Sequence, residues 1–268
     1  MPELPEVETI KNELIPHVIG HSITGVTLFD EKIVRQPSVE EFCSRLIGQK
    51  ITGVGRRGKY LIFDLTSGEA LIIHLKMSGS LLLKPPERFT RAILRLDGGT
   101  ELYFRDPRKF GAMWLVADKN AFLNKLGPEP LAAGFNPKIL AQRLSKHTVP
   151  IKAVLCDQNF VAGIGNMYAD EALFLARIHP LRSAKSLSQE EIERLHRAIQ
   201  QVLLAAINNK GASVDTYFRP DGQIGTAHFQ FRVAHRGGEP CPVCRTPIER
   251  IVVRNRGSYF CRKCQPES

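Results

Sequence analysis

Two residues at the start of the chain are suited to covalent chemistry. The sequence begins Met-Pro-Glu-Leu-Pro-Glu-Val-Glu, and a small second residue permits removal of Met1. The ring nitrogen of Pro2 then becomes a secondary α-amine, which titrates near pH ~8 and is partly neutral at physiological pH. Such an amine attacks a carbon at the aldehyde oxidation level and gives an iminium ion, a cationic electron sink. Glu3 lies beside it and can transfer a proton. In the alternative interpretation, Pro and Glu only begin a helix.

The strongest pattern in the sequence is a set of four cysteines near its end. Cys241 and Cys244 form one Cys-x2-Cys pair, and Cys261 and Cys264 form a second pair after 16 intervening residues. This spacing is typical of a four-cysteine zinc site. Four thiolates leave zinc no open position, so we predict one structural Zn²⁺ and no catalytic metal. A metal is required because about thirty residues cannot build a hydrophobic core alone.

The charge of the chain indicates its partner. The 268 residues carry a formal net charge of +10 on an otherwise ordinary composition, with 43% hydrophobic residues. A nucleic acid is the leading partner for such a chain, and a basic but inert surface is the alternative. No run approaches the ~18 apolar residues of a membrane helix, and no leader peptide is visible. We therefore expect an intracellular monomer that binds no membrane.

Two further stretches suit phosphate groups. Residues 248–253 and 258–260 are the predicted strands of a hairpin closed by the zinc, and Arg256 lies in the turn between them. Residues 163–166, Gly-Ile-Gly-Asn, precede a predicted helix, whose N-terminus favours an anion. The motif lacks the P-loop Lys and the dinucleotide fingerprint, which disfavours a nucleotide cofactor. A contact with a backbone phosphate and simple packing both stay open.

A helix must hold the N-terminus in place if it is to react. Val7, Ile10, Leu14 and Val18 recur at spacings of three and four, which predicts an amphipathic helix over residues 5–19. Pro16 predicts a kink or an end near Leu14.

Short apolar runs separated by turn residues follow, which predicts a β region up to about residue 116. The runs cover residues 22–29, 50–55, 60–65, 70–77, 80–83, 92–96, 101–104 and 112–116. Many short strands suggest an antiparallel sandwich or barrel. Polar turns interrupt them and place Lys59, Met77, Arg108 and Phe110 between strands. Each turn by itself is equally well explained as a solvated basic loop.

After the β region the chain is predicted to be helical up to Gly211, and residues 215–238 are predicted to form a loop. A polar, loop-rich stretch from residue 117 to 149 marks a domain boundary. The predicted helices are residues 139–144, 151–156, 168–177 and a long helix that a capping box opens at Ser188 and Gly211 ends.

Taken together, these motifs resemble the formamidopyrimidine-DNA glycosylases, bifunctional enzymes of base-excision repair. The resemblance covers the whole chain, with the stretches 1–9, 74–79, 106–111, 126–131, 163–171 and the cysteine hairpin. It implies an α+β fold, with an N-terminal β-sandwich, a helical domain containing a helix–two-turns–helix, and a C-terminal four-cysteine zinc-finger hairpin. Damaged double-stranded DNA would lie in the cleft between them. The expected domains are 1–132, 133–234 and 235–268.

The resemblance also implies an activity and a place. The family removes oxidised purines, such as 8-oxoguanine and formamidopyrimidines, and cleaves the abasic strand by β,δ-elimination through a Schiff base. We expect a bacterial cytoplasmic protein that joins the nucleoid when it binds DNA.

The resemblance implies a role for each matching residue. Pro2 is the nucleophile at C1′, Glu3 the acid that assists base departure and ring opening, Lys59 the proton donor of β-elimination, and Arg256 the residue tied to phosphate binding and δ-elimination. Met77, Arg108 and Phe110 fill the gap left by the extruded base, and Lys152 and Asn166 contact phosphates around the lesion.

Two stretches depart from the family pattern. Arg88-Phe89-Thr90-Arg91 stands where a Lys-His-x-His stretch is common, so Arg91 would replace a lost His contact with DNA. Within residues 226–234, expected to cap the flipped base, the sequence also differs, and Val233-Ala234-His235 replaces a usual Val-Tyr-Gly run. These differences bear on base preference more than on the chemistry.

Two other functions compete with this one. An endonuclease VIII-like glycosylase would prefer oxidised pyrimidines, although Leu4-Pro5-Glu6 and the trio of Met77, Arg108 and Phe110 favour the purine enzyme. A non-catalytic zinc-finger DNA-binding protein explains the charge and the cysteines but gives Pro2 and Lys59 no task.

Overall fold

The computed structural model describes residues 1–214 and 216–267 of the chain. The chain divides by its internal contacts into two compact units. Unit 1 comprises Met1–Lys125 and Ile207–His228, and unit 2 comprises Leu126–Ala206 and Phe229–Ser268. Segment Ile207–His228 returns to the N-terminal unit after most of the helical region. The three predicted domains, 1–132, 133–234 and 235–268, stay a prediction.

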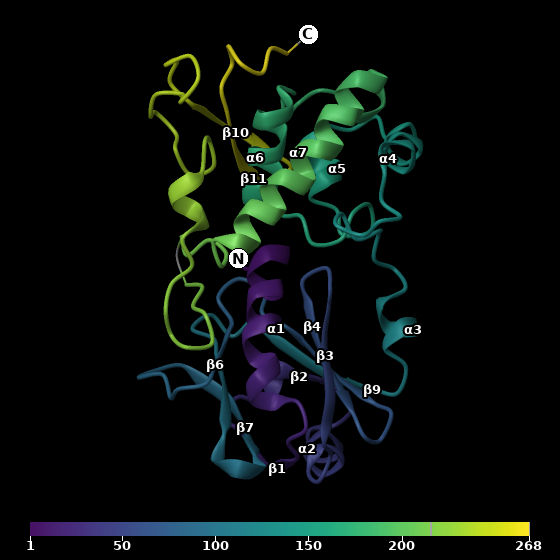
Figure 1. Ribbon diagram of the computed structural model, residues 1–268, viewed down its shortest axis with the longest axis vertical. Helices are drawn as coiled ribbons and strands as arrows, with labels where there is room; N and C mark the ends of the chain where they lie inside the picture. Colours follow the sequence, from purple (N-terminus) through teal and green to yellow (C-terminus); the bar gives the residue numbers. More distant parts are fainter. Residues whose placement is uncertain (215, 268) are drawn as a thin grey trace. The chain divides into compact units, whose positions relative to one another are not determined.

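Unit 1 begins with helix α1 (Leu4–Val18), which has the predicted apolar face. Ile10 and Leu14 on this face are fully buried, and the helix packs against the strands next to it (Figure 1). The predicted end near Leu14 is wrong, because the helix continues to Val18 with Pro16 in its last turn. Pro16 removes only the bond to the carbonyl of Asn12, an exposed residue, where water can replace the lost donor.

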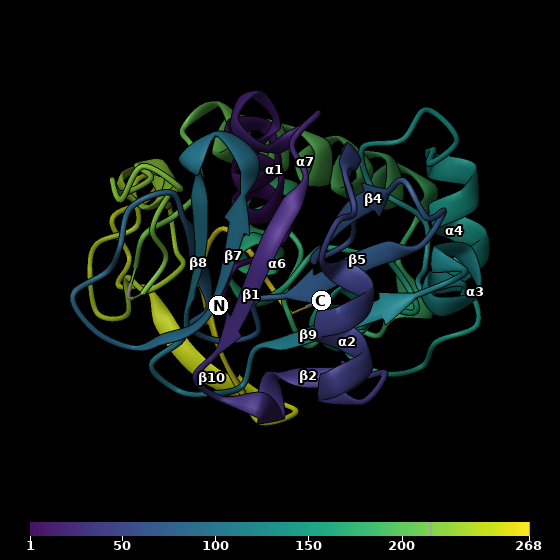
Figure 2. The ribbon, with the colours of Figure 1, turned by 90° about the horizontal axis from the view of Figure 1, so that it is seen from below.

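Two β-sheets make up most of unit 1. The five-stranded sheet has the order β2 (Val34–Gln36), β9 (Ala112–Val116), β5 (Ala70–His74), β4 (Tyr60–Leu65) and β3 (Ile51–Arg57). The four-stranded sheet has the order β1 (Ile23–Leu28), β7 (Thr90–Leu96), β8 (Glu101–Arg105) and β6 (Ser80–Leu82). In Figure 2, β1, β7 and β8 run side by side in one layer, and β2, β9 and β5 belong to the other.

The two sheets and α1 share one hydrophobic core. Phe63 and Ile73 of one sheet, Leu94 and Phe104 of the other, and Ile10 of α1 all belong to the same buried cluster. Two β-sheets that bury their inner faces against each other form a sandwich, and both sheets are antiparallel except for the parallel pair β2–β9. The prediction of an N-terminal β-sandwich is confirmed.

Short elements of unit 1 were missing from the prediction. They are η1 (Glu31–Ile33), β2, α2 (Val39–Leu46), η2 (Asp97–Gly99) and α3 (Lys119–Leu123). Strand β2 has three residues, two of them polar and exposed, so it shows no alternation that could be read from sequence. Helix α2 did carry a signal, because Ser38 is its N-cap and accepts a hydrogen bond from the Glu41 N–H at 3.3 Å.

Unit 2 contains helices and one hairpin. The helices are α4 (Pro137–Leu144), α5 (Ile151–Leu155), α6 (Asn166–Ala176), η3 (Ala184–Ser186) and most of α7 (Gln189–Asn208). The hairpin consists of β10 (Glu249–Val253) and β11 (Arg256–Phe260). The short helix η4 (Ala227–Gln230) begins in unit 1 and ends in unit 2. The predicted capping box opens α7, since Ser188 and Glu191 exchange side-chain to backbone hydrogen bonds of 3.3 and 2.8 Å. Strand β11 packs against α6. No helix in the described part of the chain is long and apolar enough to cross a membrane.

Candidate active site

The N-terminal residues are held rigidly at the start of α1. Pro2 is buried, Glu3 is 1% exposed, and Met1 is 40% exposed. Glu3 is the N-cap of the helix and forms a capping box with Glu6. The Glu6 carboxylate accepts the Glu3 N–H at 2.7 Å and the Ala212 N–H at 2.8 Å. Glu6 therefore joins the N-terminus to segment Ile207–His228, which we call the returning segment. In the sequence, only the position of Glu6 in the capping box could have suggested this role.

Lys59 lies in the tight turn between β3 and β4. It is 5% exposed, and Gly58 before it has a φ of 57°, which suits glycine. Arg56 holds this turn against α1: its Nε donates to Glu8 at 2.7 Å and its Nη1 to the Gly58 carbonyl at 2.9 Å. Burial acts to raise the pKa of Glu8, but hydrogen bonds from Lys11 and Arg56 lower it below its usual value. The tie between α1 and the Lys59 turn is therefore an ion pair.

His74, at the end of β5, is a functional candidate that the motif analysis did not single out. Burial lowers the pKa of His74 to about 3, and the charges of Lys76 and Lys59 act in the same direction. Its Nδ1 accepts the Lys76 N–H at 2.9 Å, so in the neutral ring the proton is on Nε2. Its ring packs edge-on against Tyr60 at 4.7 Å. The result is a neutral hydrogen-bond donor in the neighbourhood of Lys59.

The trio of Met77, Arg108 and Phe110 lies on two turns that a single buried carboxylate joins. Met77 is 41% and Phe110 47% exposed, and the Arg108 guanidinium lies over the Phe110 ring at 5.0 Å. Asp106, which is fully buried, accepts hydrogen bonds from the Ser78 hydroxyl at 2.5 Å and the Arg108 N–H at 3.2 Å.

The same carboxylate also fixes the far end of the second turn. Asp106 accepts the Gly111 N–H at 2.7 Å, and a Cβ on Gly111 would lie 2.3 Å from the Phe104 ring, so the position requires glycine. Arg91 lies in the same cluster, where its Nε donates to the Asp106 carbonyl at 2.8 Å. Arg91 thus has a structural bond here, and its contact with DNA stays a prediction.

In unit 2, the predicted phosphate ligands lie together at the start of α6. Lys152 is 1% exposed; its Nζ donates to the Asn166 carbonyl at 2.7 Å and pairs with the buried Asp170. The Asn166 side-chain N–H donates to the Gly257 carbonyl at 2.8 Å, next to Arg256. In this arrangement Lys152 holds the start of α6, Asn166 holds the hairpin, and their contacts with phosphate stay predictions.

Arg256 differs slightly from its predicted place. The turn of the hairpin is Arg254–Asn255, both with positive φ, and Arg256 is the first residue of β11, opposite Val253. Arg254 and Arg256 line a cavity of about 580 Å³ together with residues of α5 and the turn after it. Gln158, in that turn, holds the Gly-Ile-Gly stretch through bonds of 2.9 Å from the Gly163 N–H and 2.8 Å to the Ile164 carbonyl.

The four predicted zinc ligands converge. Their Sγ atoms all lie within 4.8 Å of one another, with 3.8 Å between Cys241 and Cys264 and 3.4 Å between Cys244 and Cys261. A tetrahedral zinc with Zn–S bonds of about 2.3 Å separates its sulfurs by about 3.8 Å. The cluster therefore fits one structural zinc ion that these four thiolates fully coordinate.

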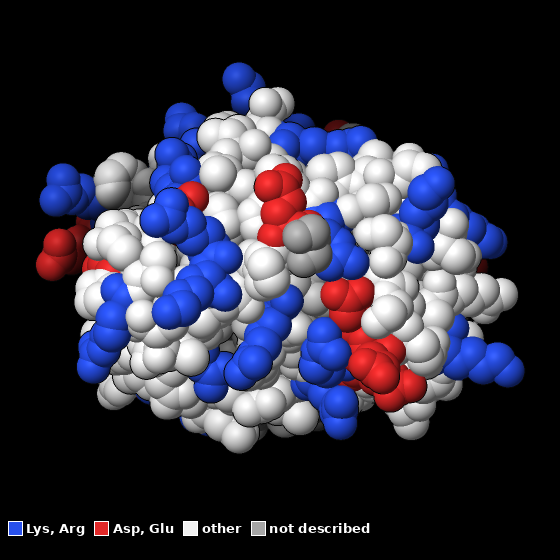
Figure 3. Space-filling model, turned by 90° about the horizontal axis from the view of Figure 1, so that it is seen from above, with Lys and Arg blue, Asp and Glu red and all other residues white. Residues whose placement is uncertain are grey.

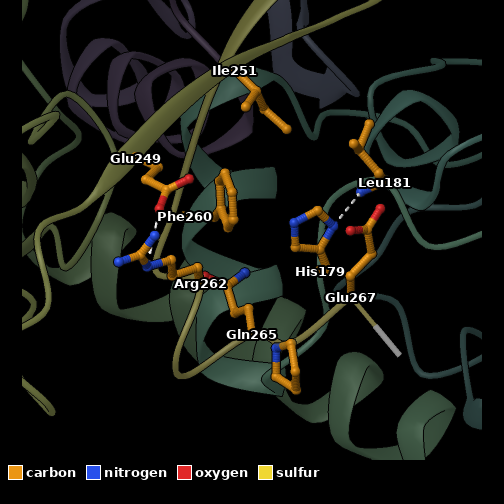
Figure 4. Close-up of a pocket in the computed structure, with 9 residues that line it drawn as sticks. His179, Leu181, Glu249, Ile251, Phe260, Arg262, Gln265 and Glu267 are labelled. Carbon is orange, nitrogen blue, oxygen red and sulfur yellow. Dashed lines mark hydrogen bonds and ion pairs between the residues drawn. The ribbon is translucent and has the colours of Figure 1, made fainter.

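The open end of the hairpin is fastened by a residue that sequence reasoning missed. Gln265 is fully buried; its side chain accepts the Cys261 N–H at 3.0 Å and donates to the Ile178 carbonyl at 2.9 Å. A cavity of about 460 Å³ lies beside it, and Figure 4 shows the residues that line it. Among them, the rings of His179 and Phe260 meet edge-on with centroids 4.6 Å apart. These contacts attach the zinc hairpin to the segment after α6.

The surface charge follows the composition. Figure 3 shows one face of the molecule, where Lys and Arg side chains are widespread and Asp and Glu gather in a few groups. Such a surface attracts a polyanion.

Sequence patterns of one family match most of the chain. The Formamidopyrimidine-DNA glycosylase N-terminal domain matches residues 1–113, its H2TH domain residues 126–217, and the zinc finger found in FPG and IleRS residues 238–266. The chain belongs to the formamidopyrimidine-DNA glycosylase family. The predicted fold, with its sandwich, helix–two-turns–helix domain and zinc hairpin, is thereby confirmed.

Individual proteins agree with this assignment along the whole length. The formamidopyrimidine-DNA glycosylase of Chloroflexus aurantiacus is 48% identical over 99% of this chain and 98% of its own, and that of Geobacillus kaustophilus is 45% identical over 99% and 100%. The MutM (FPG) protein of Thermus thermophilus matches with a TM-score of 0.91 and 42% identity over 100% of both chains. A Lactococcus lactis FPG mutant in complex with Fapy-dG-containing DNA matches with a TM-score of 0.92 and 36% identity, over 99% and 100%.

Replacing Asp106 by Asn should destabilise unit 1. The amide keeps one acceptor but places an N–H₂ group against the donors of Gly111 or Ser78, and such a buried mismatch costs about 1–3 kcal/mol. Urea unfolding measures the change. The control is Asp97→Asn, whose side chain is 48% exposed and where we expect a much smaller loss. Equal losses at the two positions would contradict the role given to Asp106.

Replacing His74 by Gln should flatten the pH dependence of stability. Folding lowers the pKa of His74 from 6.5 to about 3, so the unfolded chain binds more protons between these values. The stability that His74 allows is therefore fully present above pH 6.5. Below pH 6.5 the unfolding free energy falls, by up to ~1.4 kcal/mol per pH unit. The drop in unfolding free energy from pH 7 to pH 5 should therefore shrink by roughly 2 kcal/mol. His17→Gln, at an exposed position of α1, is the control, and an unchanged slope in the His74 variant would refute the prediction.

Proposed function

We propose that this chain excises oxidised purines from double-stranded DNA and cleaves the strand at the resulting abasic site, with Pro2 as the nucleophile. The observation that carries the proposal is the match of the whole chain to this family together with a buried Pro2 and Glu3 at the start of an anchored helix. The +10 charge supplies attraction for the DNA backbone. The protein acts in the bacterial cytoplasm, at the nucleoid.

The first step extrudes the damaged nucleotide. Chemistry at a glycosidic carbon requires the base to leave the stack, at a cost of a few kcal/mol. Met77 and Phe110 are large apolar side chains exposed on turns, and they replace lost stacking by inserting into the gap. Arg108 takes over hydrogen bonds of the orphan base. Because Asp106 joins both turns, the three side chains approach the helix as one rigid group.

The second step joins the sugar to the protein. After removal of Met1, the lone pair of the Pro2 nitrogen attacks C1′, the bond from C1′ to the base breaks with its electron pair leaving on the base, and the proton released from the Pro2 nitrogen neutralises the departing base. Glu3 delivers the proton that opens the sugar ring at O4′, and the product is an iminium ion between Pro2 and C1′. Anchoring of Glu3 by Glu6 keeps this acid in place, since a loose chain end would not hold it.

The third step breaks the strand. The iminium withdraws electrons and acidifies the C2′ hydrogen; loss of that proton expels the 3′-phosphate, and a second elimination expels the 5′-phosphate. Lys59 is the proton donor of the first elimination, and Arg256 binds the phosphate and assists the second. Asn166 and Lys152 orient the phosphates around the lesion. The zinc ion stiffens the hairpin that carries Arg256, and this elimination chemistry runs through the amine.

Borohydride trapping tests the nucleophile. With Met1 removed, the chain should form a covalent adduct with an 8-oxoguanine duplex, because borohydride reduces the iminium to a stable amine. Pro2→Gly leaves a terminal primary amine and should still be trapped. A chain that retains a residue before Pro2 has an amide there and should bind the duplex without being trapped. An adduct from that retained form would exclude Pro2 as the nucleophile.

A panel of single-lesion duplexes tests the substrate class. We expect faster release of 8-oxoguanine opposite cytosine than of thymine glycol, with products of both eliminations on a sequencing gel. The opposite preference would assign the chain to the endonuclease VIII type. A protein that retards every duplex in a gel and cuts none would be a DNA-binding zinc-finger protein without catalysis.

A further inference from the structure

The returning segment of unit 1 closes into a compact loop. The Thr226 N–H donates to the Asn209 carbonyl at 2.9 Å, and Ala212 and Thr226 form an isolated β-bridge, so the two ends of the loop lie together. The Gly225 N–H donates to the Ser213 hydroxyl at 2.9 Å across the neck. Compact loops with adjoining ends often carry function. We call residues 213–214 and 216–225 the returning loop.

The returning loop is joined both to the residue that holds the N-terminus and to the turn that carries Met77. At its neck, Ala212 donates to Glu6, the residue that also holds Glu3. Farther along, the Thr216 hydroxyl donates to the Met77 carbonyl at 3.5 Å, and the Leu83 N–H donates to the Pro220 carbonyl at 2.8 Å. The nucleophile attacks the sugar of the damaged nucleotide, while Met77 fills the place its base has left. A loop attached to both therefore borders the space that the extruded base enters.

An arginine fixes the far end of the returning loop to the catalytic helix. Arg219 Nε lies 3.0 and 3.2 Å from the two carboxylate oxygens of Glu13 on α1, and its Nη2 lies 2.8 Å from one of them. Both side chains are 19% exposed. Forked Arg–carboxylate pairs are stronger and more directional than single ion pairs, and the hydrogen bond to Glu13 raises the pKa of Arg219 further above its ordinary value.

The backbone of Arg219 also closes a turn of the returning loop. Its N–H donates to the Gln223 carbonyl and its carbonyl accepts the Gly222 N–H, both at 2.8 Å. A second carboxylate, Asp221, lies 3.3 Å from its guanidinium and accepts the Gln223 N–H at 2.9 Å. The turn 219–223 is thus one bonded unit, and its attachment to α1 runs through the guanidinium.

We propose that Arg219 is a positioning residue for base excision, which acts through Glu13 to hold the returning loop against α1 beside the extruded base. This inference rests on the proposed function. It predicts that the loop assists the step in which a base is present and is dispensable once the base is gone. Arg219 itself touches neither the base nor the sugar.

The test compares two DNA substrates under single-turnover conditions. Arg219→Gln should slow excision of 8-oxoguanine by about three- to tenfold, the range for loss of a forked ion pair, and leave cleavage of a duplex with a preformed abasic site unchanged. Arg95→Gln is the matched control, because Arg95 pairs with Glu101 on the surface of the same unit, away from the loop. The exchanged pair Glu13→Arg with Arg219→Glu should recover part of the excision rate.

Each outcome decides the proposal. Equal slowing on both substrates, or a fall in thermal midpoint without a selective loss of excision, would show that Arg219 only stabilises the fold. An excision rate equal to that of the parent protein would exclude a positioning role. If the parent protein cuts neither duplex, the proposed function fails first and this role fails with it.

Discussion

The N-terminus of unit 1, where we propose that the chemistry takes place, is held by a single buried carboxylate. Glu6 is fully buried, and its two oxygens accept N–H groups from Glu3 and Ala212, which are separated by more than two hundred residues of sequence. A hydrogen bond to a charged acceptor in a buried site contributes about 1.5–3 kcal/mol. One side chain thus removes the freedom that chain ends normally have and sets the position of the returning loop relative to the reactive end.

The same device recurs twice elsewhere. Asp106 collects donors from two turns and makes one group of Met77, Arg108 and Phe110. In unit 2, Glu171 of α6 accepts the backbone N–H groups of residues 232–234 at 2.8–2.9 Å. Burial raises the pKa of Glu171, and these N–H groups counteract it. Burying a carboxylate costs free energy unless hydrogen-bond donors surround it. Each of these carboxylates therefore fixes the conformation of the backbone stretch that supplies its donors.

The Glu171 site also gives a physical meaning to a departure from the family pattern. Val233 and Ala234 are at most 1% exposed, and their backbone rather than their side chains reaches Glu171. Their identity affects how the chain packs as it enters the zinc hairpin, where Val233 joins the buried cluster of Cys241 and Cys261. Because the side chains of Val233 and Ala234 are buried, they cannot contact a flipped base.

Local patterns were sufficient to predict what is local in this chain. Helical periodicity identified α1, period-two runs identified most strands, and cysteine spacing identified the metal cluster, because each depends on residues a few positions apart. The predicted roles of Pro2, Glu3 and Lys59 came from resemblance, and the structure adds how they are held. Contacts over long sequence distances were not predictable: no local signal pairs Glu6 with Ala212, Arg219 with Glu13, or Gln265 with Ile178. The burial of Lys152 was missed for the same reason, since Asp170 is hidden as its partner only once α5 and α6 have packed.

This division between local and long-range information matches a division of tasks in the molecule. The residues proposed to react lie at the ends of regular elements, where α1 and the tight β3–β4 turn leave little freedom. The residues that we propose contact the lesion lie on turns that Asp106 joins, and Arg219 ties the returning loop to α1. The ion pair between Arg219 and Glu13 is one of several bonds that hold the returning loop, and a partly exposed ion pair contributes little to global stability. Glu6 thus anchors both the N-terminus and the neck of the returning loop, whereas Glu13 anchors only the turn 219–223, so a change at Arg219 or Glu13 leaves the bonds of the N-terminus intact.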